Sequence, residues 1–197
     1  MKFDITKRLP GVDREIARTT NRRHLAILEN FRRHSILEVC GMWEGILEPD
    51  MIVPEPIYRF HSPKETRVIE GMEAVRKEYV SYVADKTTVI YHTNETIAAN
   101  DDGLFTEYVS HRFFPGEYLK RLGDSIDDPA ATYLVSLTQA MFWPYDDQAR
   151  VIEERVYRGN DRKLRRCDPS EVITMQECRE KLLPLLRNVM SPVAVSA

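Results

Sequence analysis

The sequence lacks a long apolar run and an excess of charge of either sign. No stretch approaches the roughly 18 consecutive apolar residues that a transmembrane helix needs, so we expect no membrane-spanning segment. The formal net charge is −3, from 28 basic and 31 acidic side chains. Binding to nucleic-acid phosphates favours a basic excess concentrated on one face, and we therefore expect no nucleic-acid partner.

Cysteine is scarce as well, and the three present are Cys40, Cys167 and Cys178. An odd number without a close pair predicts neither a disulfide framework nor a cysteine zinc site, and it indicates free thiols in a reducing compartment. The first residues are interrupted by charges and lack the apolar core of a signal peptide. We therefore expect a cytoplasmic protein.

The motifs of several large enzyme classes are missing too. The sequence has no nucleophile elbow, no phosphate-binding glycine loop and no dinucleotide fingerprint. It also lacks the His-x-His and His-x-x-x-His spacings of common metal sites. These absences argue against covalent acyl transfer, nucleotide-dependent redox chemistry and metal catalysis, so we expect no cofactor and no metal.

What is present is typical of one compact domain. The 197 residues are 43% hydrophobic and 30% charged, which is ordinary globular usage and enough for one core. Apolar spacing predicts an amphipathic helix over residues 21–39, capped by Asn21 or Thr20. A short helical turn closed by Pro49 follows, and a second helix begins at Gly71.

The rest of the sequence predicts strands. An extended segment covers residues 51–60, and from residue 87 two strands are joined by the turn NDDG, because Asp-Gly supplies the positive φ of a tight hairpin. A second pair of strands flanks the turn PYDDQ. A terminal helix is predicted to be capped by Asp168 or Ser170 and disturbed at Pro184. Helices that precede a meandering sheet indicate the α+β class.

Three passages together are similar to a known superfamily. ILEPDMIVPEP resembles an acidic turn that leads into a first strand, GMEAVRKEYVSYV resembles a Gly-x-x-Ala-(Ile/Val)-Arg helix start, and ARVIEERVY resembles a final strand. Their order and spacing, over about residues 21–157, resemble the NTF2-like superfamily. Its members include SnoaL-type polyketide cyclases, ketosteroid isomerases, scytalone dehydratase and limonene epoxide hydrolase.

The resemblance implies an NTF2-like cone, in which N-terminal helices pack on a strongly curved mixed or antiparallel sheet, here followed by a C-terminal tail helix. It divides the chain into an N-terminal extension at 1–20, a SnoaL-like domain at 21–166 and a C-terminal helix and tail at 167–197. It also implies a homodimer formed through the sheet face.

The overlay on ketosteroid isomerases implies a role for Glu55. In that family the residue before the proline that ends this passage is the aspartate that shuttles the proton, and Glu55 occupies the place before Pro56. A glutamate can do this work if burial adjusts its pKa. The family's two oxyanion-hole donors, however, fall at Phe31 and near Met141, which cannot donate. Without them an enolate loses several kcal/mol of stabilisation, which argues against steroid isomerisation itself.

Other polar aromatic residues on the predicted strands could replace these donors. His92 and His111 are predicted acid–base partners of Glu55. Because side chains alternate along a strand, Tyr91 and His92 cannot both face inward, and the sequence leaves the choice of face open. The full set of predicted substrate-binding residues is Phe31, Trp43, Tyr58, His61, Tyr91, Tyr108, Met141 and Trp143.

Each of these interpretations has a purely structural alternative. Glu55 would be a carboxylate at a strand edge between prolines that stop further pairing, and the histidines and aromatics would belong to the core. Glu107 and Glu154 lie in strands among apolar neighbours, where a buried carboxylate is costly unless it is paired. Glu153, Glu154 and Arg155 could form only a salt network that faces a dimer partner.

Three functions remain open. The first is a cofactor-independent enzyme of the SnoaL-like type, which moves a proton on an apolar, ring-containing small molecule and so isomerises, dehydrates or cyclises it. The second is a non-catalytic ligand-binding or dimerisation module whose cone is filled by its own side chains. The third is the small subunit of a ring-hydroxylating dioxygenase.

Overall fold

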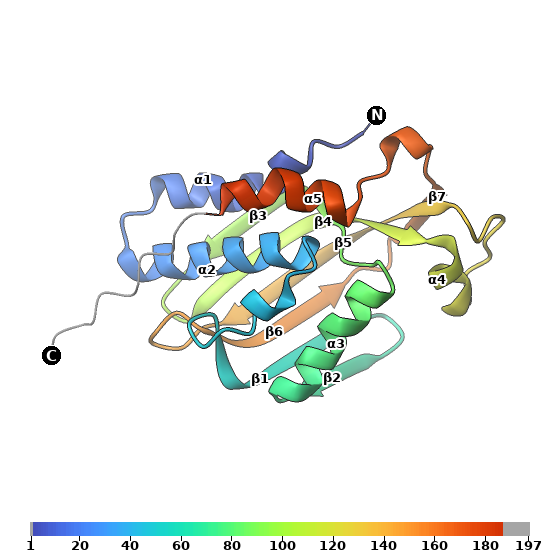
Figure 1. Cartoon of the computed structure of the whole chain (residues 1–197). Coiled ribbons are helices and arrows are strands. Elements are labelled where there is room, and N and C mark those ends of the chain that lie inside the picture. The colour runs from blue at the N-terminus through green and yellow to red at the C-terminus, as the bar shows by residue number, and fades with distance from the viewer. Residues whose placement is uncertain (1, 187–197) are drawn as a thin grey trace, which may run out of the picture.

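The structure, a computed structural model, describes residues 2–186 and shows the predicted α+β architecture (Figure 1). The helices are α1 (Pro10–Arg18), α2 (Arg22–Val39), α3 (Met72–Ala84), α4 (Gly116–Arg121) and α5 (Met175–Leu182). The strands are β1 (Ile52–His61), β2 (Thr66–Glu70), β3 (Ile90–Ala99), β4 (Gly103–Pro115), β5 (Thr132–Pro144), β6 (Val151–Arg158) and β7 (Lys163–Arg166).

The seven strands form one mixed, curved sheet. Its order is β2-β1-β6-β5-β4-β3, and β7 pairs with β5 beyond the end of β6. Only the β1–β6 pair is parallel among these strands, since all other neighbours are antiparallel. The predicted NDDG turn joins β3 to β4, where the Asn100 side chain accepts from the amides of Asp102 and Gly103, each at 3.0 Å. The mixed sheet of the prediction is therefore confirmed.

Helix α2 packs against the sheet and covers the core on that side. The Asn21 side chain caps it as predicted and accepts from the amides of Arg23 and His24 at 2.9 and 3.2 Å. One face of the helix is buried against the sheet through Ile27, Phe31 and further residues. Helices α1, α2 and α5 lie together over β3, β4 and β5, whereas α3 covers β1 and β2 (Figure 1). None of the helices in residues 2–186 is long and apolar enough to cross a membrane.

Four elements were not predicted from the sequence. Helix α1 lies in the segment that the sequence described only as a polar leader, and it buries Val12 and Ile16. Helix α4 and strand β7 lie in segments for which the sequence predicted neither a helix nor a strand. Strand β2 pairs with β1, but its side chains are exposed apart from Ile69, so its pattern carries no strand signal.

The start of the terminal helix was predicted wrongly. Helix α5 begins at Met175 because the Thr174 side chain accepts from the amide of Glu177 at 3.1 Å. Asp168, the predicted cap, instead accepts from the amide of Ser170 at 2.8 Å and caps a short 3-10 turn. The predicted helix also extends past residue 186, and that part lies outside the described residues.

Candidate active site

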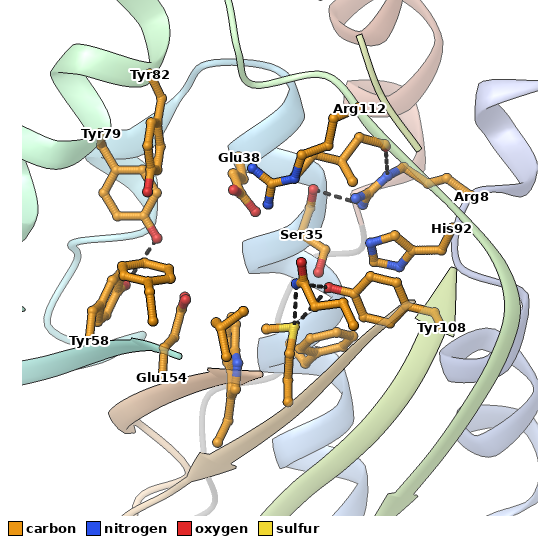
Figure 2. Close-up of a pocket in the computed structure, with 17 residues that line it drawn as sticks. Arg8, Ser35, Glu38, Tyr58, Tyr79, Tyr82, His92, Tyr108, Arg112 and Glu154 are labelled. Atoms are coloured by element: carbon orange, nitrogen blue, oxygen red, sulfur yellow. Dashed lines mark hydrogen bonds between the residues drawn. The ribbon is translucent and has the colours of Figure 1, made fainter. Parts of the chain in front are cut away.

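A small cavity lies between α2, α3 and the concave face of the sheet (Figure 2). Its volume is about 30 Å³, room for about two water molecules. Of the side chains that line it, only those of Glu38, Tyr82 and Arg112 are partly exposed, and all the others are buried. These three residues therefore form the mouth of the cavity, through which it meets solvent.

The inner wall carries a chain of buried polar groups from four elements, β1, α3, α2 and β6. The hydroxyls of Tyr58 and Tyr79 lie 3.0 Å apart, and the Tyr79 hydroxyl lies 2.9 Å from Nε2 of His34. Glu154 Oε1 lies 3.3 Å from the same nitrogen. Tyr58 and Glu154 are direct partners in the parallel β1–β6 register, which brings both onto the concave face. We call these four residues the inner wall.

Burial makes the inner wall electrically neutral. It lowers the pKa of His34 to about 3, with a smaller contribution from the positive charge of Arg8. Burial also raises the pKa of Glu154 well above its usual range, and the nearby charge of Glu38 raises it further. Both shifts therefore favour a neutral imidazole and a protonated carboxyl in the close His34–Glu154 contact over a salt bridge.

Charge is concentrated instead near the mouth. Burial raises the pKa of Glu38, while the positive charges of Arg112 and Arg8 oppose this effect. Glu38 and Arg112 face one another in Figure 2 without a hydrogen bond or an ion pair within 4.0 Å. Arg8 is fully buried and donates to the backbone carbonyls of Ser35 and Ile90, at 2.8 and 3.1 Å.

A second buried pair lies beside Arg8. His92 Nδ1 lies 3.3 Å from Glu95 Oε1, and the ring of His92 stacks on Tyr108 with centroids 3.7 Å apart. A bulge between Thr93 and Thr96 turns Glu95 to the interior as well. Burial lowers the pKa of His92 to about 4, although the hydrogen bond to Glu95 works against it.

Glu95 is ionised because its carboxylate accepts hydrogen bonds at the N-terminus of helix α1. Its carboxylate accepts from the backbone amides of Gly11 and Val12, at 2.7 and 3.2 Å. Burial raises the pKa of Glu95, but His92 and these two amides together hold it below its usual value. A Cβ on Gly11 would lie only 2.6 Å from Glu95 Oε2, so the close approach requires glycine there.

The structure brings six of the residues singled out in the sequence to the cavity. They are Phe31, Tyr58, His92, Tyr108, Met141 and Trp143. The predicted alternation holds, because His92 and Tyr108 face the cavity whereas Tyr91 and His111 face away from it. The sequence left open which face of the sheet lines the cavity. The structure shows that it is the face that carries His92 and Tyr108.

The prediction that Glu55 lines the cone is wrong. Its side chain is exposed, and its Oε2 would lie 3.2 Å from a Cβ at Gly71, at the start of α3. Strand β1 begins at Ile52, and its inward positions include Tyr58 and Phe60. Glu55 therefore cannot meet a molecule bound in the cavity.

Four further predicted site residues also lie outside the cavity. His111 lies between Thr93 and Ser136, at 2.8 Å from each, beside a groove of about 460 Å³. The other three use their rings in packing. Tyr91 stacks on Phe3, His61 stacks on Tyr157, and Trp43 packs under the guanidinium of Arg76.

Several cavity residues were missed, although two signals pointed to them. His34, Ser35 and Glu38 follow Phe31 at helical spacing, which places them on the face of α2 that Phe31 buries. Glu154 was noted as a carboxylate among apolar neighbours, the signal of a buried acid. Arg8 gave no signal, because only the packing of the N-terminal segment brings it inside.

The cavity groups are suited to the transfer of protons. They comprise the carboxyls of Glu38 and Glu154, the imidazole of His92 and several phenols, of which those of Tyr58 and Tyr79 share a hydrogen bond. No group of three or more His, Cys, Asp or Glu side chains within residues 2–186 could hold a metal ion. In Figure 2, Glu38 from α2 and Glu154 from β6 point towards the same central space from opposite sides.

Comparison with known proteins defines the fold. An NTF2-like protein from Anabaena variabilis ATCC 29413 is 15% identical, covers 73% of this chain and 96% of its own, and has a TM-score of 0.53. A protein named as a SnoaL-like polyketide cyclase, from Jannaschia sp. CCS1, is 15% identical, with coverages of 72% and 90% and a TM-score of 0.53. No protein-family model and no curated protein matches the chain. The chain therefore has the cone-shaped fold of the NTF2-like superfamily, as the sequence predicted.

Proposed function

We propose that the protein is a cofactor-independent enzyme of the SnoaL-like type, which moves a proton within a small molecule bound in the cone. The observation that carries the proposal is a pair of carboxyl groups, Glu38 and Glu154, directed at one cavity from opposite sides. Environments that make two acids differ in protonation provide an acid and a base at the same pH. Isomerisation, dehydration and cyclisation all need such a pair.

Glu38 is the base in this proposal. It lies at the mouth and forms no ion pair within 4.0 Å with any residue in 2–186, and the positive charge of Arg112 favours its ionised carboxylate. Its raised pKa strengthens it as a proton acceptor relative to an exposed glutamate. The sequence predicted this role for Glu55. Because Glu55 is exposed and lies outside the cavity, we assign the role to Glu38 instead.

Glu154 and Tyr58 are the hydrogen-bond donors on the opposite side. A neutral carboxylic acid donates a hydrogen bond that a carboxylate cannot, and burial raises the pKa of Glu154, which favours this neutral form. A developing oxyanion placed against these donors is stabilised without a metal ion. This pair replaces the donors that the sequence found missing at Phe31 and Met141.

The size of the cavity restricts the substrate. The space of about 30 Å³ accepts the reacting atoms of a molecule but not a whole ring system. The rest of the substrate must therefore lie in the mouth, against the ring of Tyr82. We propose a small ring compound that enters with its acidic C–H bond first.

Deuterium exchange tests this function whatever the final product is. Small cyclic ketones and aromatic keto acids are incubated with the full chain in D₂O, and loss of the C–H signal is followed by proton NMR. We expect acceleration for at least one compound, and a rate about 10²–10⁴-fold lower for Glu38→Gln. The matched variant Glu55→Gln should exchange as fast as the wild type, and equal rates for Glu38→Gln would disprove the assignment of the base.

One observation favours a second function, a non-catalytic ligand-binding or dimerisation module. Phe31, Met141 and Trp143 are buried against the small cavity, and the rings of Phe31 and Trp143 meet edge to face with centroids 5.1 Å apart. The outer face of the sheet also exposes aromatic rings, such as that of Phe105, 47% exposed and stacked on Phe142. A wild type that exchanges no compound, but forms a homodimer that Phe105→Glu disrupts, would establish this module instead.

A further inference from the structure

The side chains of Arg112 at the mouth, and of Arg158 on the same concave side of the sheet, have no hydrogen-bond or ion-pair partner among the described residues. Within residues 2–186, neither Arg112 nor Arg158 takes part in a side-chain hydrogen bond or an ion pair within 4.0 Å. Arg112 lines the cavity directly. Arg158 follows Glu154 and Val156 at alternate positions of β6, both of which line the cavity, and it is the register partner of Gln139, which also does. Both guanidinium groups therefore belong to the concave side.

Arg158 is largely withdrawn from water as well. Its guanidinium lies over the ring of Phe60, 5.5 Å from the centroid, and Phe60 is itself a cavity residue. Burial lowers the pKa of Arg158, and the positive charge of Arg112 lowers it further. A cation held near another cation and away from solvent is unfavourable unless an anion is bound between them.

The other charges around the mouth cancel in pairs. Arg67 binds Glu78 through two hydrogen bonds of 2.7 and 2.6 Å, and Arg121 binds Asp85. What remains is Arg112 and Arg158 against one carboxylate, Glu38. The mouth therefore carries an excess of one positive charge, to which the buried Arg8 adds on the inner side.

Aromatic rings complete the surroundings of these arginines. Tyr82 from α3 lines the mouth, and Phe60 lies beneath Arg158. Burial raises the pKa of Tyr118 from α4, and the charges of Arg112 and Arg158 each act to lower it. Because such an effect needs short distances, Tyr118 belongs to the surroundings of both arginines. A flat ring has apolar surfaces to contact here, while an attached anionic group can reach the two guanidiniums.

We propose that Arg112 and Arg158 bind the carboxylate of an acidic, ring-containing substrate at the mouth of the cavity. The inference rests on the proposed function, since it names the substrate class of the same site. Guanidinium groups bind carboxylates through paired hydrogen bonds. Such a contact anchors the molecule at the mouth and directs its remaining atoms towards Glu38 and Glu154.

Binding of benzoate to the ¹⁵N-labelled full chain, followed by amide NMR, tests this proposal. Benzamide is the neutral comparison, because it has nearly the same shape without the charge. We expect benzoate to bind at least tenfold more tightly, with shifts around the mouth. Arg158→Gln and Arg112→Gln should each reduce this preference at least tenfold, and Arg158→Lys should retain part of it.

The matched control is Arg162→Gln, which removes an arginine bound to Asp124 away from the cavity. It should bind benzoate as the wild type does. Equal binding of benzoate and benzamide, or equal benzoate binding by Arg158→Gln and Arg162→Gln, would overturn the proposal. Glu38→Gln separates the two hypotheses: it should abolish deuterium exchange but keep benzoate binding, so the base and the anion site can fail independently.

Discussion

The inner wall and the mouth of the cavity differ in charge: the inner wall carries groups whose neutral forms are favoured, and the mouth carries arginines. At the inner wall, His34 and Glu154 are buried, and burial shifts the pKa of each in the direction that favours the uncharged form. At the mouth, Arg112 and Arg158 keep their charges without a partner in residues 2–186. The difference teaches that burial in this cone favours the neutral forms of His34 and Glu154, whereas the two arginines on the concave side stay without a side-chain partner among the described residues.

Removal of inner packing should have the largest effect on stability. Met141 is 8% exposed and accepts a hydrogen bond from the Tyr108 hydroxyl at 2.8 Å. Met141→Ala leaves a cavity, and we expect a loss of about 2–5 kcal/mol in the free energy of unfolding. Urea denaturation measures it. At the mouth, Arg112→Gln should change stability by no more than about 0.5 kcal/mol, and an equal loss in both variants would remove the contrast.

Glu154 should make stability depend on pH in a characteristic direction. Its pKa is raised on folding, so the folded state binds a proton that the unfolded state releases above about pH 4.5. The stability of the wild type relative to Glu154→Gln should thus fall as pH rises above this value, by up to about 1.4 kcal/mol per pH unit. Denaturation curves from pH 5 to 8 give the slope, and a constant difference would show that Glu154 is ionised in the folded protein.

His92 should produce the opposite slope. Its pKa falls to about 4 on folding, so the unfolded chain binds the extra proton below about pH 6.5. The stability of the wild type relative to His92→Gln should therefore fall as pH decreases from 6.5 to 5, again by up to about 1.4 kcal/mol per unit. The two effects oppose each other in the wild type, which is why each must be measured against its own variant. A stability difference that falls with rising pH for Glu154→Gln and one that increases with rising pH for His92→Gln would together sharpen the comparison.

The hydrogen bond between two inner phenols should have the smallest effect. Tyr58→Phe removes a hydroxyl that lies 3.0 Å from that of Tyr79, and we expect a loss of about 1 kcal/mol. Tyr157→Phe removes the hydroxyl of a ring that is 46% exposed on the outer face and should cost less than about 0.5 kcal/mol. Thermal unfolding compares the two variants, and equal shifts would mean that the inner chain is not held by its hydrogen bonds.

The architecture was predictable because it depends on local signals. Helix α2 has an apolar stripe and the Asn21 cap, and the β3–β4 hairpin has its Asp-Gly turn. Strand β2 was not predictable, because an exposed edge strand shows no alternation, and its pairing with β1 is decided in three dimensions.

The site was predictable only in part. Tyr108 and Trp143 were identified because they are large aromatic residues on predicted strands, and Met141 because the resemblance places it where the family has an oxyanion-hole donor; all three line the cavity. Glu55 was misplaced because the resemblance fixes sequence position, but the path of β1 decides which side chains turn inward. Arg8 could not have been found, since its burial depends on the tertiary packing of α1 and the preceding turn.

The central claim is that two carboxyl groups at one cavity differ in protonation. Carbon-13 NMR of the side-chain carboxyl carbons of labelled glutamates, with the signal of Glu154 assigned by its absence in Glu154→Gln, tests this claim most directly. We predict that the Glu154 signal keeps the chemical shift of a protonated acid at pH 7, whereas the Glu38 signal, assigned by its absence in Glu38→Gln, shows a carboxylate. A Glu154 signal with the chemical shift of a carboxylate at pH 7 would contradict the account.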